Sequence, residues 1–119
     1  MNVVELNVDF EPQSLKSNMK NEFFIILRLK NTTNTDNFWC ECDINVIHPL
    51  SLAQDKELAA GRTRIGIITG NETSEKRVKI YTRPNNYPDK YKIKITAYIY
   101  DKEGIIAQRI DREEKIECI

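Results

Sequence analysis

The sequence predicts an all-β fold, a single β-sandwich that occupies residues 1–119 and has about seven strands in two antiparallel sheets. Apolar and polar residues alternate along several segments, which is typical of half-buried strands. Clusters of Asn, Asp, Gly and Pro separate these segments and indicate turns. Helical periodicity is almost absent. Of the 119 residues, 40% are hydrophobic and 30% are charged, so one domain with one core accounts for the chain.

The first half of the chain predicts three strands. They cover residues 4–10, 23–29 and 38–47. In the second of these strands, Phe24 and Ile26 make the other face apolar as well, which indicates a central strand covered on both sides for part of its length. The polar residues 31–37 form the turn before the third strand.

The second half of the chain predicts four more strands. They cover residues 64–69, 77–82, 91–100 and 105–110. Residues 101–104 form a hairpin turn, with Gly104 placed for positive φ. Residues 58–60 are expected to form a helical turn that ends at Gly61. The charged residues 111–119 either extend the last strand or form a short helix.

Three short segments carry a resemblance to a known class of domain. Residues 29–33 (Leu-Lys-Asn-Thr-Thr) end a strand with an asparagine turn, and residues 70–73 (Gly-Asn-Glu-Thr) precede a strand. Residues 88–91 (Pro-Asp-Lys-Tyr) open the longest strand. In these segments the chain resembles immunoglobulin-like domains, particularly the CARDB (cell-adhesion-related) and fibronectin type III branches, although the usual Pro-Gly-x-Tyr lacks its glycine here. The resemblance covers most of the chain and implies an immunoglobulin-like β-sandwich, but it does not imply a function.

Charge and hydropathy argue against a dedicated nucleic-acid or membrane surface. The 18 Lys and Arg residues are balanced by 18 Asp and Glu residues, whereas a nucleic-acid-binding domain usually has a basic excess. No apolar stretch approaches the roughly 20 residues that cross a bilayer, and residues 1–10 lack the pattern of a signal peptide. We therefore expect a cytoplasmic protein.

Candidate catalytic and metal-binding groups are few. His48 is the single histidine, and it shares strand parity with Cys40 and Cys42. Cys42 and His48 are nevertheless about 20 Å apart along an extended strand, whereas zinc ligands converge within about 2.3 Å of one ion. We expect no metal and no cofactor, with Cys40 and Cys42 as small core residues and Cys118 as a third free thiol. No glycine-rich phosphate loop is present either, so the sequence predicts a protein that is not an enzyme.

Strand parity indicates one candidate interaction surface. If the alternate residues from Tyr91 to Ile99 point into the core, then Tyr98 and Tyr100 point outward. The same argument turns Trp39 outward, and antiparallel pairing of the third and sixth strands places it near both tyrosines. The last strand adds Ile105, Ala107 and Arg109 to this face. The candidate surface is Trp39, Tyr98, Tyr100, Ile105 and Arg109.

The alternative is that Trp39 is a core tryptophan like that of immunoglobulin domains, after a bulge that shifts the register by one residue. The sequence leaves both placements open.

Exposed aromatic residues ringed by charges are typical of protein interfaces. The sequence therefore favours a non-enzymatic protein-interaction or assembly module, and self-association as a homodimer is one form of this. The runner-up is a small-ligand or carbohydrate-binding sandwich. Weak nucleic-acid binding is third, because the basic residues of strands 77–82 and 91–100 are expected on opposite sheets.

Overall fold

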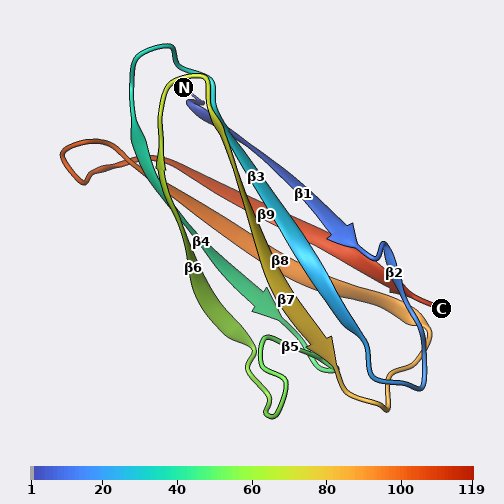
Figure 1. Ribbon diagram of the computed structural model, residues 1–119. Helices are drawn as coiled ribbons and strands as arrows, with labels where there is room; N and C mark the ends of the chain where they lie inside the picture. The colour runs from blue at the N-terminus through green and yellow to red at the C-terminus, as the bar shows by residue number, and fades with distance from the viewer. Residues whose placement is uncertain (1) are drawn as a thin grey trace.

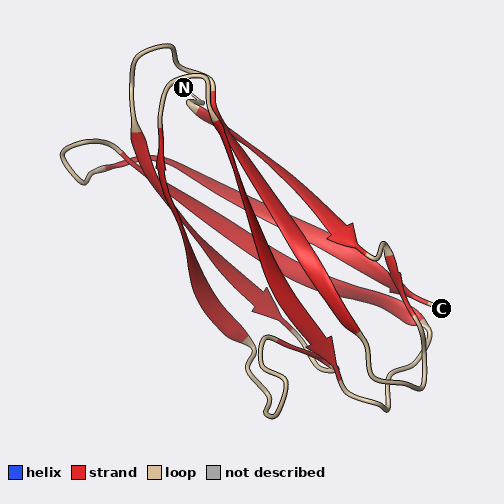
Figure 2. Ribbon diagram, in the orientation of Figure 1, coloured by secondary structure: helices blue, strands red, loops and turns tan. Residues whose placement is uncertain are grey.

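The computed structural model describes residues 2–119, and within these residues it contains strands and loops but no helix (Figure 2). The nine strands form two stacked sheets (Figure 1). Their bounds are β1 Val4–Glu11, β2 Ser14–Leu15, β3 Glu22–Asn31, β4 Phe38–Val46, β5 Leu50–Ser51, β6 Ala60–Ile68, β7 Thr73–Thr82, β8 Asp89–Tyr100 and β9 Ile106–Cys118.

The first sheet has four strands in the order β1-β3-β7-β5, and the second sheet has five in the order β2-β9-β8-β4-β6. All the pairings are antiparallel except that of β2 with β9. The prediction of an all-β chain with two sheets is therefore confirmed. As predicted, β7 and β8 lie in opposite sheets.

The predicted count of about seven strands is too low. The two additional strands, β2 and β5, have two residues each. Segments this short carry no alternation pattern, because alternation needs at least about four residues to be seen. They form because the chain passes along an existing strand, β9 or β7, whose backbone groups are open to pairing.

The predicted helical turn at residues 58–60 is wrong. These residues leave an irregular loop and enter β6 at Ala60. Ser51 organises the loop, because its Oγ donates to the Lys56 carbonyl oxygen at 2.7 Å and accepts from the Ala53 and Leu58 amides. The charged tail is strand, since β9 continues to Cys118 along β8.

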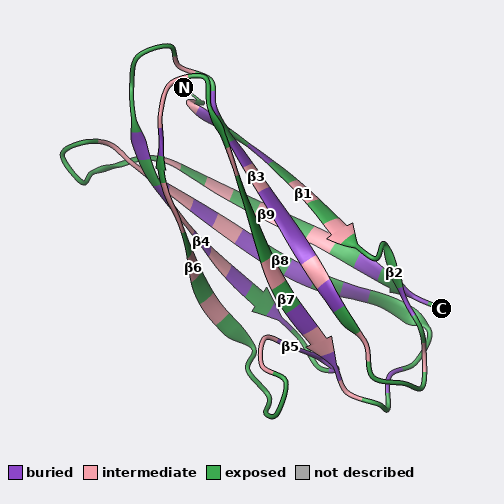
Figure 3. Ribbon diagram, viewed as in Figure 1, coloured by how far each residue is buried: buried purple, intermediate pink, exposed green. Residues whose placement is uncertain are grey.

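The core lies between the two sheets and is built from the alternate residues of the long strands (Figure 3). Cys40 and Cys42 are fully buried in it and Cys118 is nearly so, and all three are free thiols as predicted. Two buried polar groups fasten the loops. The side-chain Nδ2 of Asn31 donates to the carbonyl oxygens of Asp36 and Ile68, and the Tyr91 hydroxyl donates to the Tyr87 carbonyl oxygen.

The outer face of the first sheet carries an ion-pair network. Arg28 pairs with Asp9 at 2.6 Å and with Glu75 at 2.9 Å, and Arg77 pairs with Glu11 at 2.9 Å. Further along the same face, Lys79 lies over the Phe24 ring. The predicted cover over the outer face of β3 thus consists of long charged side chains, not of another layer of chain.

Candidate interaction surface

Four apolar side chains line up across one end of the second sheet. Strand pairing places Ile67 of β6 beside Trp39 of β4, Trp39 beside Tyr100 of β8, and Tyr100 beside Ile106 of β9. We call these four residues the aromatic row. Ile67 is 64% exposed, Ile106 51% and Trp39 37%, whereas Tyr100 is half-buried. The row therefore presents a continuous apolar strip to solvent.

Trp39 lies on the outer face, so the alternative of a core tryptophan is wrong. Its neighbours along β4, Phe38 and Cys40, point into the core. The bulge that the alternative required does occur nearby, but the extra residue, Ile65, lies in β6 and leaves the register of β4 with β8 unchanged. The indole Nε1 donates to Glu41 Oε1 at 3.0 Å.

Two charged rows lie beside the aromatic row. The nearer row is Arg64, Glu41, Tyr98 and Arg109, and the next is Arg62, Asp43, Thr96 and Asp111. The Tyr98 ring has two guanidinium groups over it, that of Arg62 at 5.3 Å and that of Arg109 at 5.6 Å from the ring centroid. Arg62 also binds Asp43 with two hydrogen bonds, of 2.6 and 3.0 Å. These bonds lower the pKa of Asp43 and raise that of Arg62, so both groups are charged at neutral pH. On the β9 side, Arg109 pairs with Asp111 at 3.3 Å.

The structure corrects one predicted surface residue, Ile105. It lies in the hairpin turn, where its amide donates to Asp101 Oδ1 at 3.0 Å and its carbonyl oxygen accepts from the Asp101 amide. A register shift then pairs Tyr100 with Ile106 and leaves Ala107 without a partner in β8. Ile105 is exposed beside the aromatic row but is not part of the strand.

The other four predicted residues, Trp39, Tyr98, Tyr100 and Arg109, share the outer face of the second sheet. Sequence reasoning missed Ile67 and Ile106. The signal for Ile67 was the Ile67–Ile68 pair, because one of two consecutive strand residues must point outward. The register shift near Tyr100 left no signal for Ile106.

A small hollow of about 280 Å³ adjoins Trp39 and Ile67 of the aromatic row. It lies where the loop before β4 approaches the hairpin turn between β8 and β9. Its lining residues are Asn37, Phe38, Trp39, Ile67, Asp101 and Lys102.

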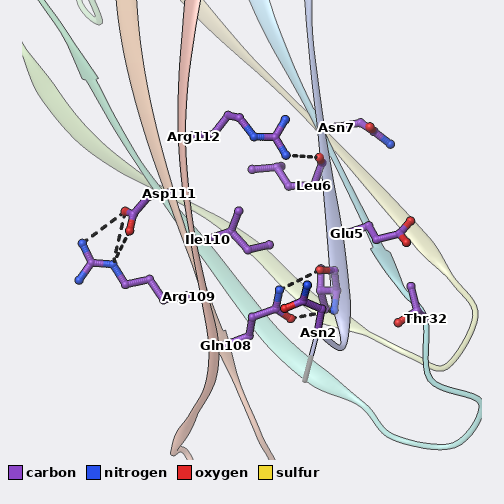
Figure 4. Close-up of a pocket in the computed structure, with 11 residues that line it drawn as sticks. Asn2, Glu5, Leu6, Asn7, Thr32, Gln108, Arg109, Ile110, Asp111 and Arg112 are labelled. Carbon is purple, nitrogen blue, oxygen red and sulfur yellow. Dashed lines mark hydrogen bonds and ion pairs between the residues drawn. The ribbon is translucent and has the colours of Figure 1, made fainter.

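A larger cleft, of about 530 Å³, runs along the seam between β1 and β9 (Figure 4). Side chains of β9 cross it to the edge of β1. Gln108 Oε1 accepts from the amides of Val3 and Val4, and its Nε2 donates to the Val4 carbonyl oxygen. Arg112 donates to the Leu6 carbonyl oxygen at 3.0 Å. We interpret the cleft as structural, because these bonds satisfy the backbone of an edge strand.

The candidate metal-binding side chains, Cys40, Cys42 and His48, lie in different environments. Burial raises the pKa of both Cys40 and Cys42 to about 12, so their thiols are uncharged at neutral pH. His48 is exposed, and its Nδ1 lies 3.1 Å from Glu57 Oε1. No cluster of three or more His, Cys, Asp or Glu side chains within residues 2–119 is arranged to hold a metal ion.

Solved structures of other proteins have a fold similar to that of this chain. The chain is similar to a FixG-related protein from Vibrio parahaemolyticus, at 13% identity over 99% of this chain and 98% of that one, with a TM-score of 0.55. A CARDB domain from Pyrococcus furiosus is similar at 10% identity over 99% and 96% of the two chains, with a TM-score of 0.48. A conjugative transposon lipoprotein from Bacteroides eggerthii is similar at 13% identity over 95% and 93%, with a TM-score of 0.47.

No protein-family model and no curated protein sequence matches the chain. At 13% identity, the likeness to the FixG-related protein concerns the all-β fold alone. The described residues, 2–119, contain no helix long and apolar enough to span a membrane.

Proposed function

We propose that this chain is an immunoglobulin-like domain that acts as a non-enzymatic protein-interaction module through the aromatic row. Its sheet orders support the class, because β1-β3-β7 corresponds to the A-B-E strands and β9-β8-β4-β6 to the extended G-F-C sheet of immunoglobulin folds. The hydrogen bond from the Tyr91 hydroxyl back to the Tyr87 carbonyl oxygen is also the geometry of a tyrosine corner.

One observation carries the interaction proposal. On the outer face of the second sheet, the apolar side chains gather in the aromatic row, while the neighbouring rows hold Arg62 and Arg109 in ion pairs. An apolar centre with a charged rim is the composition of a protein interface. Three unpaired cysteines support a reducing, cytoplasmic location for the module.

Affinity capture with variants of the row tests this proposal. A partner captured by the wild-type chain should be lost, or weakened at least about tenfold, in the Trp39→Ala and Ile67→Ala variants. Ile47→Ala is the matched control, because Ile47 is a 57% exposed isoleucine just beyond the other end of β4. Equal capture of every protein, including the chain itself, by the Trp39→Ala variant would contradict the proposal.

Carbohydrate binding is a second candidate, and the hollow beside Trp39 favours it. An aromatic side chain there adjoins the polar groups of Asn37, Asp101 and Lys102. Glycan binding that persists in about 1 M salt and disappears in Trp39→Ala would support this candidate. Nucleic acid is less well supported, because Arg77 and Lys79 are ion-paired on the first sheet while Lys92 and Lys94 lie on the second.

A further inference from the structure

We infer that the partner of the aromatic row is a second copy of this chain, packed face to face about a two-fold axis that runs parallel to the strands between β4 and β8. This inference rests on the proposed function and identifies its partner. Such a dimer is isologous, so the surface must be complementary to itself about that axis.

The aromatic row meets this requirement. Its order across the sheet is Ile67, Trp39, Tyr100 and Ile106. The axis reverses this order in the other copy, which sets Ile67 against the partner's Ile106 and Trp39 against the partner's Tyr100. An aliphatic side chain then meets an aliphatic one, and an aromatic side chain meets an aromatic one.

The charged residues give an independent reason for the same axis. Arg62 of β6 and Asp111 of β9 are the two ends of one row, since Arg62 pairs with Asp43, Asp43 with Thr96, and Thr96 with Asp111. The axis places Arg62 opposite the partner's Asp111, twice by symmetry. Opposite charges therefore meet at both ends of the row.

The row between these two holds Arg64, Glu41, Tyr98 and Arg109. The guanidinium of Arg109 lies over Tyr98, displaced from β9 toward β8. Reversal about the axis brings Tyr98 opposite the partner's Glu41 and Arg109 opposite the partner's Arg64. Because the Arg109 guanidinium lies over Tyr98, it also faces the partner's Glu41, whose carboxylate lies beside the partner's Arg64 and offsets the like charges. An axis perpendicular to the strands through the aromatic row fails this test, because it carries Arg62, Arg109 and Asp111 beyond the end of the other copy's sheet.

The face is also large enough. Four strands about 4.8 Å apart and nine residues of about 3.3 Å each span about 19 by 30 Å, and β4 and β6 each have nine residues. The accessible area of such a face exceeds its planar area of about 570 Å², and the smallest stable interfaces bury about 600 Å² per partner. An axis along the strands keeps the two sheets nearly aligned, as in face-to-face sheet packing.

Charge reversal with sedimentation equilibrium tests the axis. Arg62→Asp and Asp111→Arg should each weaken self-association at least about tenfold, because like charges then face each other. An equimolar mixture of the two variants should form a heterodimer within about threefold of wild-type affinity, because every pair in it is again opposite in sign. Circular dichroism of each variant checks that it is folded.

Arg62→Asp also removes the ion pair with Asp43, so the exchange is repeated with side chains of other lengths. Arg62→Glu and Asp111→Lys should each weaken self-association, and their equimolar mixture should restore it. The inference is overturned if the wild type is monomeric up to about millimolar concentration, at which even weak complexes form. The interaction proposal then still stands or falls on the capture experiment. A dimer that Trp39→Ala dissociates but neither mixture restores overturns the axis. A dimer indifferent to Trp39→Ala overturns the inference, while the interaction proposal still depends on the capture experiment.

Discussion

An outward-pointing isoleucine is buried on the first sheet but exposed on the second. Ile26, on the first sheet, is only 4% exposed, although it lies on the solvent side of the sandwich. Ile67, on the second sheet, is 64% exposed. Ile26 lies between Asp9 and Arg77 in its row, and the long side chains around it are held across it by ion pairs. The burial of an outward apolar residue thus depends on its cross-strand neighbours, and where they are apolar too the strip stays open.

The largest predicted effect is a difference in stability between alanine variants of these two isoleucines. Ile26→Ala should lower the free energy of unfolding by about 2–4 kcal/mol, because it removes buried methyl groups and leaves a cavity under the ion pairs. Ile67→Ala should cost less than about 1 kcal/mol, because its side chain is already in water. Urea unfolding of both variants measures the difference, and equal costs would break the comparison.

A second prediction compares the two sides of β4. Cys40 and Cys42 have pKa values raised to about 12 from 9.0 by burial. A group whose folded pKa is raised stabilises fully below its unfolded pKa, so stability should fall as the pH rises from about 9 toward 12. At pH 10.5 each thiol should account for about 1–2 kcal/mol of that loss.

The measurement is urea unfolding at pH 8 and pH 10.5 for the wild type and for the Cys40→Ala, Cys42→Ala double variant. The double variant starts less stable, but it should lose less between the two pH values. An identical loss in both proteins would mean that the thiols reach water in the folded state. Trp39, on the other side of the same strand, should be quenched readily by acrylamide at both pH values when the chain is diluted below about 10 µM, where weak association is lost.

A third prediction concerns the seam between β1 and β9. Gln108→Ala removes three hydrogen bonds to the edge of β1, so unfolding should become easier by about 1–3 kcal/mol. Hydrogen exchange at the Val4 amide should accelerate more than exchange in β8. If the Val4 amide stays as protected as before, the seam is not held by this side chain.

The smallest effect is expected on the first sheet. Arg77→Gln breaks the exposed pairs with Glu11 and Glu75, and pairs of this kind contribute little. The wild type should be slightly more stable than the variant at low salt, and the gap should shrink as salt screens the pairs. Thermal melting at two salt concentrations measures it. A gap that grows with salt would assign the effect to packing over Ile26 instead of charge.

Alternation predicted the long strands and their inner faces well, because side-chain direction in a strand depends only on parity. Parity also brought Trp39 and Tyr100 together once antiparallel pairing was assumed. Three features escaped it. The short strands β2 and β5 depend on neighbours distant in the chain, and the shift at Tyr100 exchanged Ile105 for Ile106. The cover over Ile26 depends on ion pairs between side chains of β1, β3 and β7.

The central claim is that the second sheet's outer face associates and the first sheet's does not. A dilution series followed by amide NMR shifts tests it most directly, because each face reports through its own residues. On dilution from about 1 mM to about 10 µM, the range that weak association spans, we predict shifts that move around Ile67, Trp39, Tyr100 and Ile106. Those around Ile26 and Arg77 should stay fixed. Movement centred on the first sheet, or no movement on either, would contradict the claim.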